Sequence, residues 1–266
     1  KVAYLNRFKT AKQVTQTLSD LKDGKIDILI GTHALIEEKI KFKNLGLAII
    51  DEQHKFGVAQ RSKLWKKNFF PPHMLIMTAT PIPRTLAMTA YGDLDISIID
   101  ELPKGRLEIK TFLKSDSKRL EIFNFIKKQI NEGRQIYIVY PLIEESKKMD
   151  YKDLMDGYES ISREFPLPKY KISILHGKMK YDEKKIEMKR FIKGETQIMV
   201  ATTVIEVGVN IPNASVMIIE SAEKFGLSQL HQLRGRVGRG NFQSYCILVA
   251  SEKKSNEAKI RLETMK

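Results

Sequence analysis

The fold is decided by Leu47-Ala48-Ile49-Ile50-Asp51-Glu52-Gln53-His54, an apolar run that ends in two adjacent acids. Four apolar residues in a row are typical of a strand buried on both faces of a parallel sheet. Two carboxylates at the end of such a strand can hold Mg²⁺ and orient a water beside a nucleotide phosphate. A solvated strand end is the alternative interpretation, so the rest of the chain has to decide between the two.

Apolar runs of the same kind recur along the chain, at residues 26–30, 74–77, 136–139, 172–175, 198–200, 216–219 and 246–249. Residues 2–5 also have the pattern of a strand. Helical periodicity lies between the runs and is clearest at residues 120–130 and 181–192. This alternation predicts an α/β fold in which helices cover parallel sheets.

The sequence also repeats itself. Lys22-Asp23-Gly24-x-x-x-Ile28-Leu29-Ile30-Gly31-Thr32 matches Ile192-Lys193-Gly194-x-x-x-Ile198-Met199-Val200-Ala201-Thr202. Each copy is followed by an asparagine turn and an apolar strand that ends in an acid, at residues 44–51 and 213–220. The repeat predicts two lobes of similar topology. The turn-rich stretch at residues 102–106 is the natural hinge, so we expect lobes at residues 1–104 and 105–266.

The charge balance points to a polyanionic partner. The chain has 46 Lys and Arg against 32 Asp and Glu, a net charge of +14. Such an excess most often indicates nucleic acid, although a merely solubilising basic surface is the alternative. Cys246 is the single cysteine, which fits a reducing compartment. No signal peptide and no apolar stretch of about 18 residues occurs, so a cytoplasmic location is expected.

Two arginines form a second candidate site. Arg236 and Arg239 lie in Gln232-Leu233-Arg234-Gly235-Arg236-Val237-Gly238-Arg239. The spacing predicts that both share one face of a helix that begins at Ser228. There they could neutralise charge on a transferring phosphoryl group. A solvated basic face is the alternative, but two glycines would weaken a purely structural helix.

The remaining motifs say less when taken alone. Thr78-Ala79-Thr80-Pro81-Ile82-Pro83-Arg84 follows a predicted strand with hydroxyls and a base, and residues 200–212 join another strand to a turn. The five histidines are scattered, so a structural metal site is not expected. The sequence contains no G-x-x-x-x-G-K-[ST] loop, the usual cradle for nucleotide phosphates.

In their order and spacing these motifs resemble those of superfamily 2 helicases and translocases. The matching stretches are residues 31–35, 51–54, 78–84, 136–146, 201–212 and 232–240, which resemble motifs Ib, II, III, IV, V and VI. Within the superfamily, residues 51–58, 90–95, 100–103 and 225–232 are most similar to the RecG family of bacterial DNA helicases. The transcription-repair coupling translocase is a near relative that usually has Glu in place of Gln53.

The resemblance implies the fold and a role for each motif residue. It implies two RecA-like parallel-sheet lobes of the P-loop NTPase type, the first incomplete at its N-terminus. Asp51 would hold Mg²⁺ through water, and Glu52 would orient the hydrolytic water. Both would take part in ATP binding together with Gly208, Gln232, Arg236 and Arg239, and the two arginines would reach the γ-phosphate. His54, Thr78 and Thr80 would couple nucleotide state to lobe movement, and Thr32, Arg84, Thr202 and Thr203 would touch the DNA backbone. Asn210 departs from the Asp of many relatives.

The resemblance also implies a function. ATP and Mg²⁺ would drive translocation on duplex DNA, remodelling stalled forks or Holliday junctions in recombination and repair. The partners would be branched or duplex DNA and single-strand-binding or other replication-fork proteins, with a monomeric enzyme and no membrane. The phosphate loop and a wedge domain are expected before Lys1 and a translocation hairpin after Lys266, so this chain by itself is expected to be inactive. The alternatives are a transcription-repair coupling type of translocase, a catalytically silent DNA-binding fragment, and an ATPase that does not act on nucleic acid.

Overall fold

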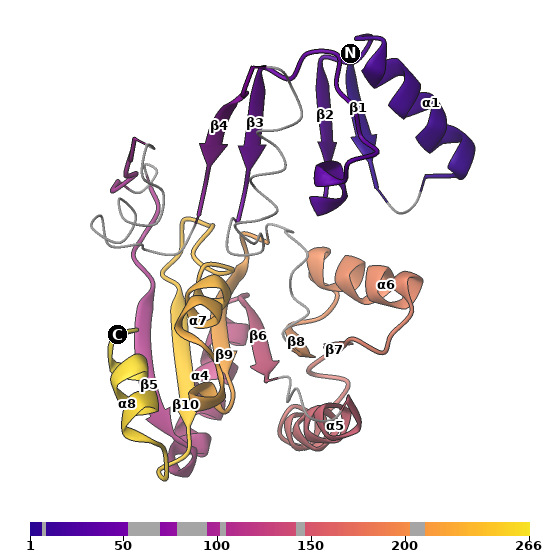
Figure 1. Ribbon diagram of the computed structural model, residues 1–266. Helices are drawn as coiled ribbons and strands as arrows, with labels where there is room; N and C mark the ends of the chain where they lie inside the picture. Colours follow the sequence, from indigo (N-terminus) through magenta and orange to yellow (C-terminus); the bar gives the residue numbers. More distant parts are fainter. Residues whose placement is uncertain (7–8, 53–69, 79–94, 102–104, 142–146, 203–210) are drawn as a thin grey trace. The chain divides into compact units, whose positions relative to one another are not determined.

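The computed structural model describes residues 1–6, 9–52, 70–78, 95–101, 105–141, 147–202 and 211–266 (Figure 1). The chain divides into two compact units, Lys1–Gly92 and Asp93–Lys266. Every strand pairing between described residues is parallel, which confirms the predicted α/β fold. The lobe boundary between residues 104 and 105 remains a prediction.

The second unit is built on a six-stranded parallel sheet in the order β5-β10-β9-β6-β8-β7. Its strands are β5 (Lys110–Ser115), β6 (Gln135–Tyr140), β7 (Ile172–Leu175), β8 (Ile198–Thr202), β9 (Ala214–Ile219) and β10 (Tyr245–Ala250). Its helices are α4 (Arg119–Asn131), α5 (Lys147–Glu164), α6 (Tyr181–Ile192), α7 (Leu227–Arg234) and α8 (Asn256–Glu263), with short 3₁₀ turns η3 (Asp116–Lys118) and η4 (Ala222–Lys224). None of the described helices is both long and apolar enough to cross a membrane.

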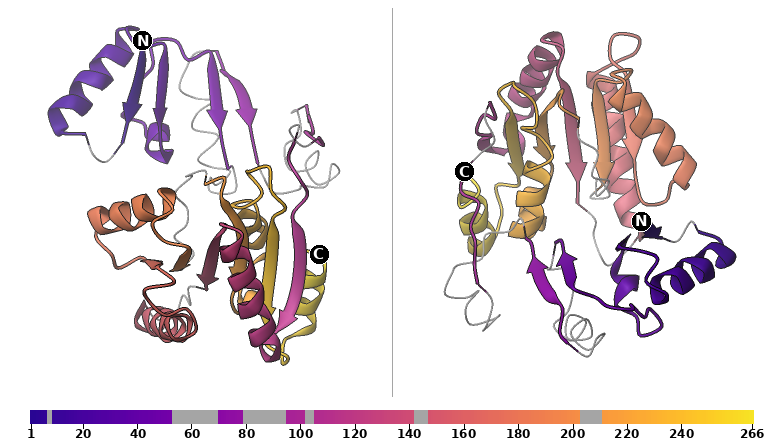
Figure 2. Two further views of the ribbon diagram at one scale, coloured as in Figure 1. Left: turned by 180° about the vertical axis from the view of Figure 1, so that it is seen from behind. Right: turned by 90° about the horizontal axis from the view of Figure 1, so that it is seen from above.

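Helices cover both faces of this sheet (Figures 1 and 2). On one face, Ile136 and Ile138 of β6 pack in a cluster with residues of α4 and α5. On the other, Tyr137 and Val139 of the same strand pack with α6, α7 and α8. Alternate residues of one strand therefore enter different cores, and this is why the strand sequences are apolar without interruption.

The first unit contains two pairs of parallel strands. β1 (Val2–Leu5) pairs with β2 (Ile28–Gly31), and β3 (Leu47–Ile50) pairs with β4 (His73–Ile76). The helix α1 (Ala11–Lys22) joins β1 to β2, and the 3₁₀ turn η1 (His33–Ile36) follows β2.

The strands of the first unit are not buried on both faces, contrary to the prediction from their apolar runs. In β3, Leu47 is 54% exposed and Ile49 is 59% exposed, whereas Ile50 is buried. Ile50 packs with Ile36, and the alternate side chains lack such cover. Apolar side chains favour burial, but a strand is buried on both faces only where other elements pack against each face.

The predicted repeat is present in the backbone. In β1-α1-β2 and in β7-α6-β8, a glycine follows the helix in the left-handed region, Gly24 with φ 75° and Gly194 with φ 72°. The same bonds close both helices: Lys25 N–H donates to the Asp20 carbonyl at 2.8 Å, and Glu195 N–H to the Arg190 carbonyl at 3.0 Å. Glycine is favoured at this position because it alone has no Cβ to clash.

Candidate functional site

The acid pair leaves β3 at its carboxyl end. Asp51 is exposed, and its Oδ1 accepts the backbone N–H of Glu52 at 2.9 Å. Glu52 is half-buried and has φ of 53°, a region that residues other than glycine rarely adopt. Strained backbone of this kind is concentrated at functional sites. The strand therefore ends in a defined turn. This turn exposes the Asp51 carboxylate to solvent and leaves the neighbouring Glu52 half-buried.

The same turn occurs at the matching position of the second unit. Ser221 has φ of 47°. In the described part of the chain, Glu52 and Ser221 are the two residues other than glycine that have a positive φ. It follows Glu220 as Glu52 follows Asp51. Glu220, however, is buried and bonded to Arg119. The two units thus share a backbone turn, but only the first unit leaves its strand-end acid exposed.

Two predicted hydroxyl residues lie in the first unit at strand ends. Thr78 is half-buried and lies just beyond β4, where Met77 N–H still donates to the Ile50 carbonyl at 2.8 Å. Because the register pairs Ile50 with Ile76, Thr78 leaves the sheet at the same edge as the acids. Thr32 is exposed and follows β2. The coupling role of Thr78 and the DNA contact of Thr32 remain predictions.

The arginine pair lies beyond its helix, so the prediction that both residues share a helical face is wrong. Helix α7 ends at Arg234 with Gly235 as its C-cap. Gly238 then takes φ of 77°, which no helical residue has. Arg236 is half-buried and Arg239 is exposed, with its Nε donating to the Gly235 carbonyl at 3.2 Å. The glycines that end the helix also fold the arginines into a compact turn.

Positive charges gather around Arg239. Partial burial, and then the charges of Arg236 and Arg106, lower the pKa of Arg239. Burial raises the pKa of Tyr137 to about 12, and both arginines act against this rise because they lie near its hydroxyl. A cluster of guanidinium groups repels itself unless an anion lies among them, and arginine binds phosphate through paired N–H donors. Arg106 lies in none of the predicted site motifs, and its only sequence signal is its place in the predicted hinge at residues 102–106.

The other predicted residues differ in how far the structure describes them. Gln232 is half-buried on α7. Thr202 ends β8 at 2% exposure, so its hydroxyl lies beneath the surface and its DNA contact remains a prediction. His54, Thr80, Arg84, Thr203 and Gly208 lie outside the described residues.

The residues of the first unit suit a magnesium ion held through water. Mg²⁺ prefers carboxylate oxygens and keeps several of its own waters, so it needs one or two carboxylates and not a full cage. The exposed Asp51 carboxylate offers this chemistry. Within the described residues no group of three or more His, Cys, Asp or Glu could enclose a metal by itself.

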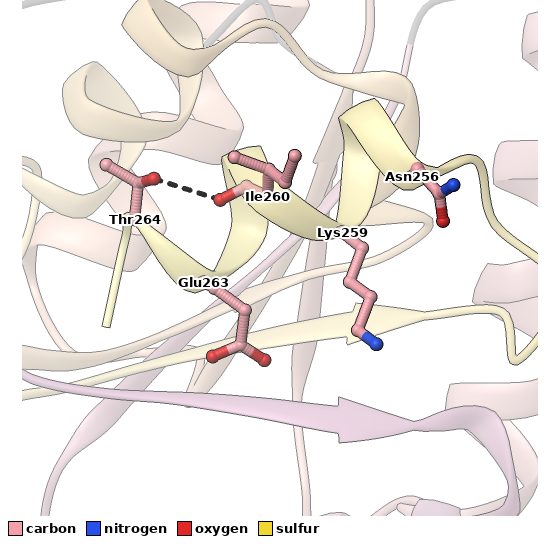
Figure 3. Close-up of a pocket in the computed structure, with 5 residues that line it drawn as sticks. All are labelled: Asn256, Lys259, Ile260, Glu263 and Thr264. Carbon is pink, nitrogen blue, oxygen red and sulfur yellow. Dashed lines mark hydrogen bonds between the residues drawn. The ribbon is translucent and has the colours of Figure 1, made fainter.

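A hollow lies on α8 (Figure 3). It is lined by Asn256, Lys259, Ile260 and Glu263 of this helix and by Thr264, its C-cap. Thr264 donates its hydroxyl back to the Ile260 carbonyl at 2.9 Å. No predicted site residue lines it.

Known families match both units. Residues 2–89 match the DEAD/DEAH box helicase family, and residues 117–241 match the helicase conserved C-terminal domain. The chain is 51% identical over 257 residues to the ATP-dependent DNA helicase RecG of Synechocystis sp. and 50% identical over 264 residues to that of Bacillus subtilis. The chain belongs to the RecG family of helicases. These alignments cover 97% and 99% of the chain but only 30% and 38% of the two RecG proteins, so the chain spans a minor part of their length.

Solved structures agree with the RecG assignment. A structure of RecG bound to a three-way DNA junction matches 99% of the chain and 34% of its own length, with 44% identity and a TM-score of 0.71. The Mycobacterium smegmatis helicase Lhr matches 99% of the chain and 36% of its own length at 15% identity and a TM-score of 0.64, which supports the fold alone.

Proposed function

We propose that the chain is the motor region of an ATP-dependent DNA helicase that remodels branched DNA, such as stalled forks and Holliday junctions. The observation that carries the proposal is the pair of complementary sites, Asp51-Glu52 after β3 and Arg236 with Arg239 after α7, in a chain of the RecG family. The RecG relative bound to a three-way DNA junction supports branched DNA as the substrate.

The residues would divide the work of ATP hydrolysis. Asp51 would hold Mg²⁺, which neutralises phosphate charge when bound, and Glu52 would orient the attacking water and accept its proton. Arg236 and Arg239 would stabilise the charge that develops on the γ-phosphate. Gln232 and Gly208 would lie beside the nucleotide. His54, Thr78 and Thr80 would relay its state to DNA contacts at Thr32, Arg84, Thr202 and Thr203.

The test uses the full-length protein that carries this chain. We expect its ATPase activity to rise on adding a three-way junction, and Arg236→Ala to lower the stimulated kcat by about 10³-fold or more, as for other arginines that contact a transferring phosphoryl group. Arg163→Ala is the matched control, because Arg163 is exposed on α5. ATP-dependent separation of a labelled junction strand gives a second readout.

Two outcomes would contradict the proposal. ATPase activity that no DNA stimulates would favour an ATPase with another substrate. DNA binding that falls steeply with salt and ignores nucleotide, without any turnover, would favour a DNA-binding protein without chemistry.

A further inference from the structure

The segment that leads into β5 runs alongside the chain that follows the arginine pair. The Lys110 N–H donates to the Ser244 carbonyl at 3.0 Å, and β5 continues in parallel pairing with β10. Just before this point, Nε2 of Gln243 donates to the Glu108 carbonyl at 2.8 Å. The segment before β5 is therefore tied to the residues that follow Arg239.

One further bond extends this tie to the arginine turn itself. Nε of Arg106, a half-buried residue, donates to the Gly238 carbonyl at 2.8 Å. Gly238 is buried, and a Cβ added to it would lie 2.8 Å from Cγ1 of Ile109. The turn is thus fitted to the segment on two sides, by a hydrogen bond and by a close contact that only glycine permits.

This bond acts directly on Arg239. The carbonyl of Gly238 and the N–H of Arg239 belong to one rigid peptide plane. A donor that fixes the carbonyl therefore also fixes the plane from which Arg239 begins. The guanidinium of Arg106 also lies close enough to contribute to the lowered pKa of Arg239.

We propose that Arg106 is a positioning residue for Arg239, which it orients through the Gly238 carbonyl while adding a third positive charge to the cluster. The proposal rests on the proposed function, in which Arg239 meets the γ-phosphate. It predicts that catalysis depends on the position of the Nε donor as well as on the charge. Lysine keeps the charge and lacks a donor at that position, so Arg106→Lys separates the two contributions.

The competing explanation is that Arg106 only anchors the segment. Gln243→Ala is the matched control, because it removes the bond to Glu108 and so loosens the same segment without touching Gly238. A merely structural role predicts that both variants lose melting temperature and kcat in the same proportion.

The kinetic test compares both variants in the full-length protein. We expect Arg106→Lys to lower the DNA-stimulated kcat about 10- to 100-fold, the effect of a misplaced catalytic group. The KM for ATP should stay within about twofold, because the arginine acts mainly in the transition state. Gln243→Ala should keep kcat within about twofold of wild type. Equal kcat losses in the two variants, or none in Arg106→Lys, would overturn the proposal.

A second measurement needs no turnover and also uses the full-length protein. Hydrogen exchange of the peptide that covers residues 236–245 should speed up about tenfold in Arg106→Lys, as expected for the loss of one hydrogen bond. Arg190→Lys, on α6 and paired with Glu187, should leave it unchanged. Unchanged exchange in Arg106→Lys would show that the bond does not hold the turn and would overturn the proposal. A wild-type protein without ATPase activity would instead reject the proposed function.

Discussion

Arg119 and Glu220 form a two-pronged ion pair in the second unit, with 2.6 Å between Nη1 and Oε1 and 2.9 Å between Nη2 and Oε2. Glu220 follows β9, and its side chain is only 5% exposed. Burial disfavours the charged guanidinium, but the bonds and charge of Glu220 outweigh this and raise the pKa of Arg119. The pair joins the end of a central strand to the first turn of α4. Because Glu220 is buried and paired with Arg119, its carboxylate is not available for a role like that of Asp51.

Breaking this pair should destabilise the second unit strongly. Arg119→Ala leaves the buried Glu220 carboxylate without its partner, and we expect a loss of about 3 kcal/mol in the free energy of unfolding. Urea unfolding of the purified chain measures it. Lys193→Ala is the control, because Lys193 and Glu195 are 3.8 Å apart and both about half exposed. Its effect should stay below about 1 kcal/mol. Equal losses would show that the buried pair carries no special weight.

The left-handed turn at Ser221 leads to a second stability prediction. A side chain at φ of 47° costs about 1–2 kcal/mol, and a β-branched one is the least tolerated there. Ser221→Gly should therefore keep or raise the melting temperature, whereas Ser221→Val should lower it. Thermal unfolding followed by circular dichroism compares the two. A less stable Ser221→Gly would mean that the serine side chain contributes more than its backbone strain costs.

The strands of the second unit could be predicted because their two faces enter two cores. Residues 172–175 and 181–192, predicted as a strand and a helix, have the observed bounds of β7 and α6. The start of β9 was predicted two residues late, since Ser215 interrupts the apolar run although it is buried. Helix α5 was missed because polar residues dominate it.

The motifs of the candidate site could be predicted from the sequence, but the residues that hold these motifs in place could not. The acid pair and the arginine pair can be recognised because each is a short local sequence motif. Arg106 bonds a residue 132 positions away, and Arg119 one that is 101 positions away. Such pairs depend on strand order, which no local pattern specifies. The prediction that the helix continues to Arg239 was wrong, because two residues three positions apart can also lie in a turn, here one formed with Gly235 and Gly238.

His231 should make stability depend on pH. Its Nδ1 accepts from Nη2 of Arg234 at 3.2 Å, and Nη1 of Arg234 donates to the Met265 carbonyl at 3.0 Å. Burial, and then the charge of Arg234, lower the pKa of His231 in the folded state. As pH falls through about 6.5, the unfolded state takes up a proton that the folded state resists, so stability falls. Above that pH the contribution is fully present.

The measurement is urea unfolding at pH 7.5 and 5.5. We expect wild type to lose more unfolding free energy between these pH values than His231→Gln, which cannot titrate. His73→Gln is the control, because His73 is exposed on β4, and it should keep the wild-type difference. The same pH dependence in His231→Gln would assign the effect to another group.

The 266-residue chain by itself should hydrolyse ATP negligibly. Its sequence holds the acid and arginine pairs but no G-x-x-x-x-G-K-[ST] loop, whose amides and lysine hold the β- and γ-phosphates in this class of enzyme. An ATPase assay on the purified chain, with and without DNA, checks this. DNA-stimulated turnover would mean that other residues of the chain cradle the phosphates.

Glu52→Gln should separate hydrolysis from binding in the full-length protein. The substitution keeps the shape of the side chain and removes its ability to accept a proton. We therefore expect kcat to fall by about 10²–10⁴-fold, with binding of a fluorescent ATP analogue unchanged. Asp51→Asn should differ, because it removes a charge that would hold Mg²⁺, and it should weaken Mg²⁺-dependent nucleotide binding. Glu121→Gln, on the exposed face of α4, is the control for losing a carboxylate. Full turnover in Glu52→Gln would remove this residue from the mechanism and leave the strained turn at φ of 53° without a catalytic purpose.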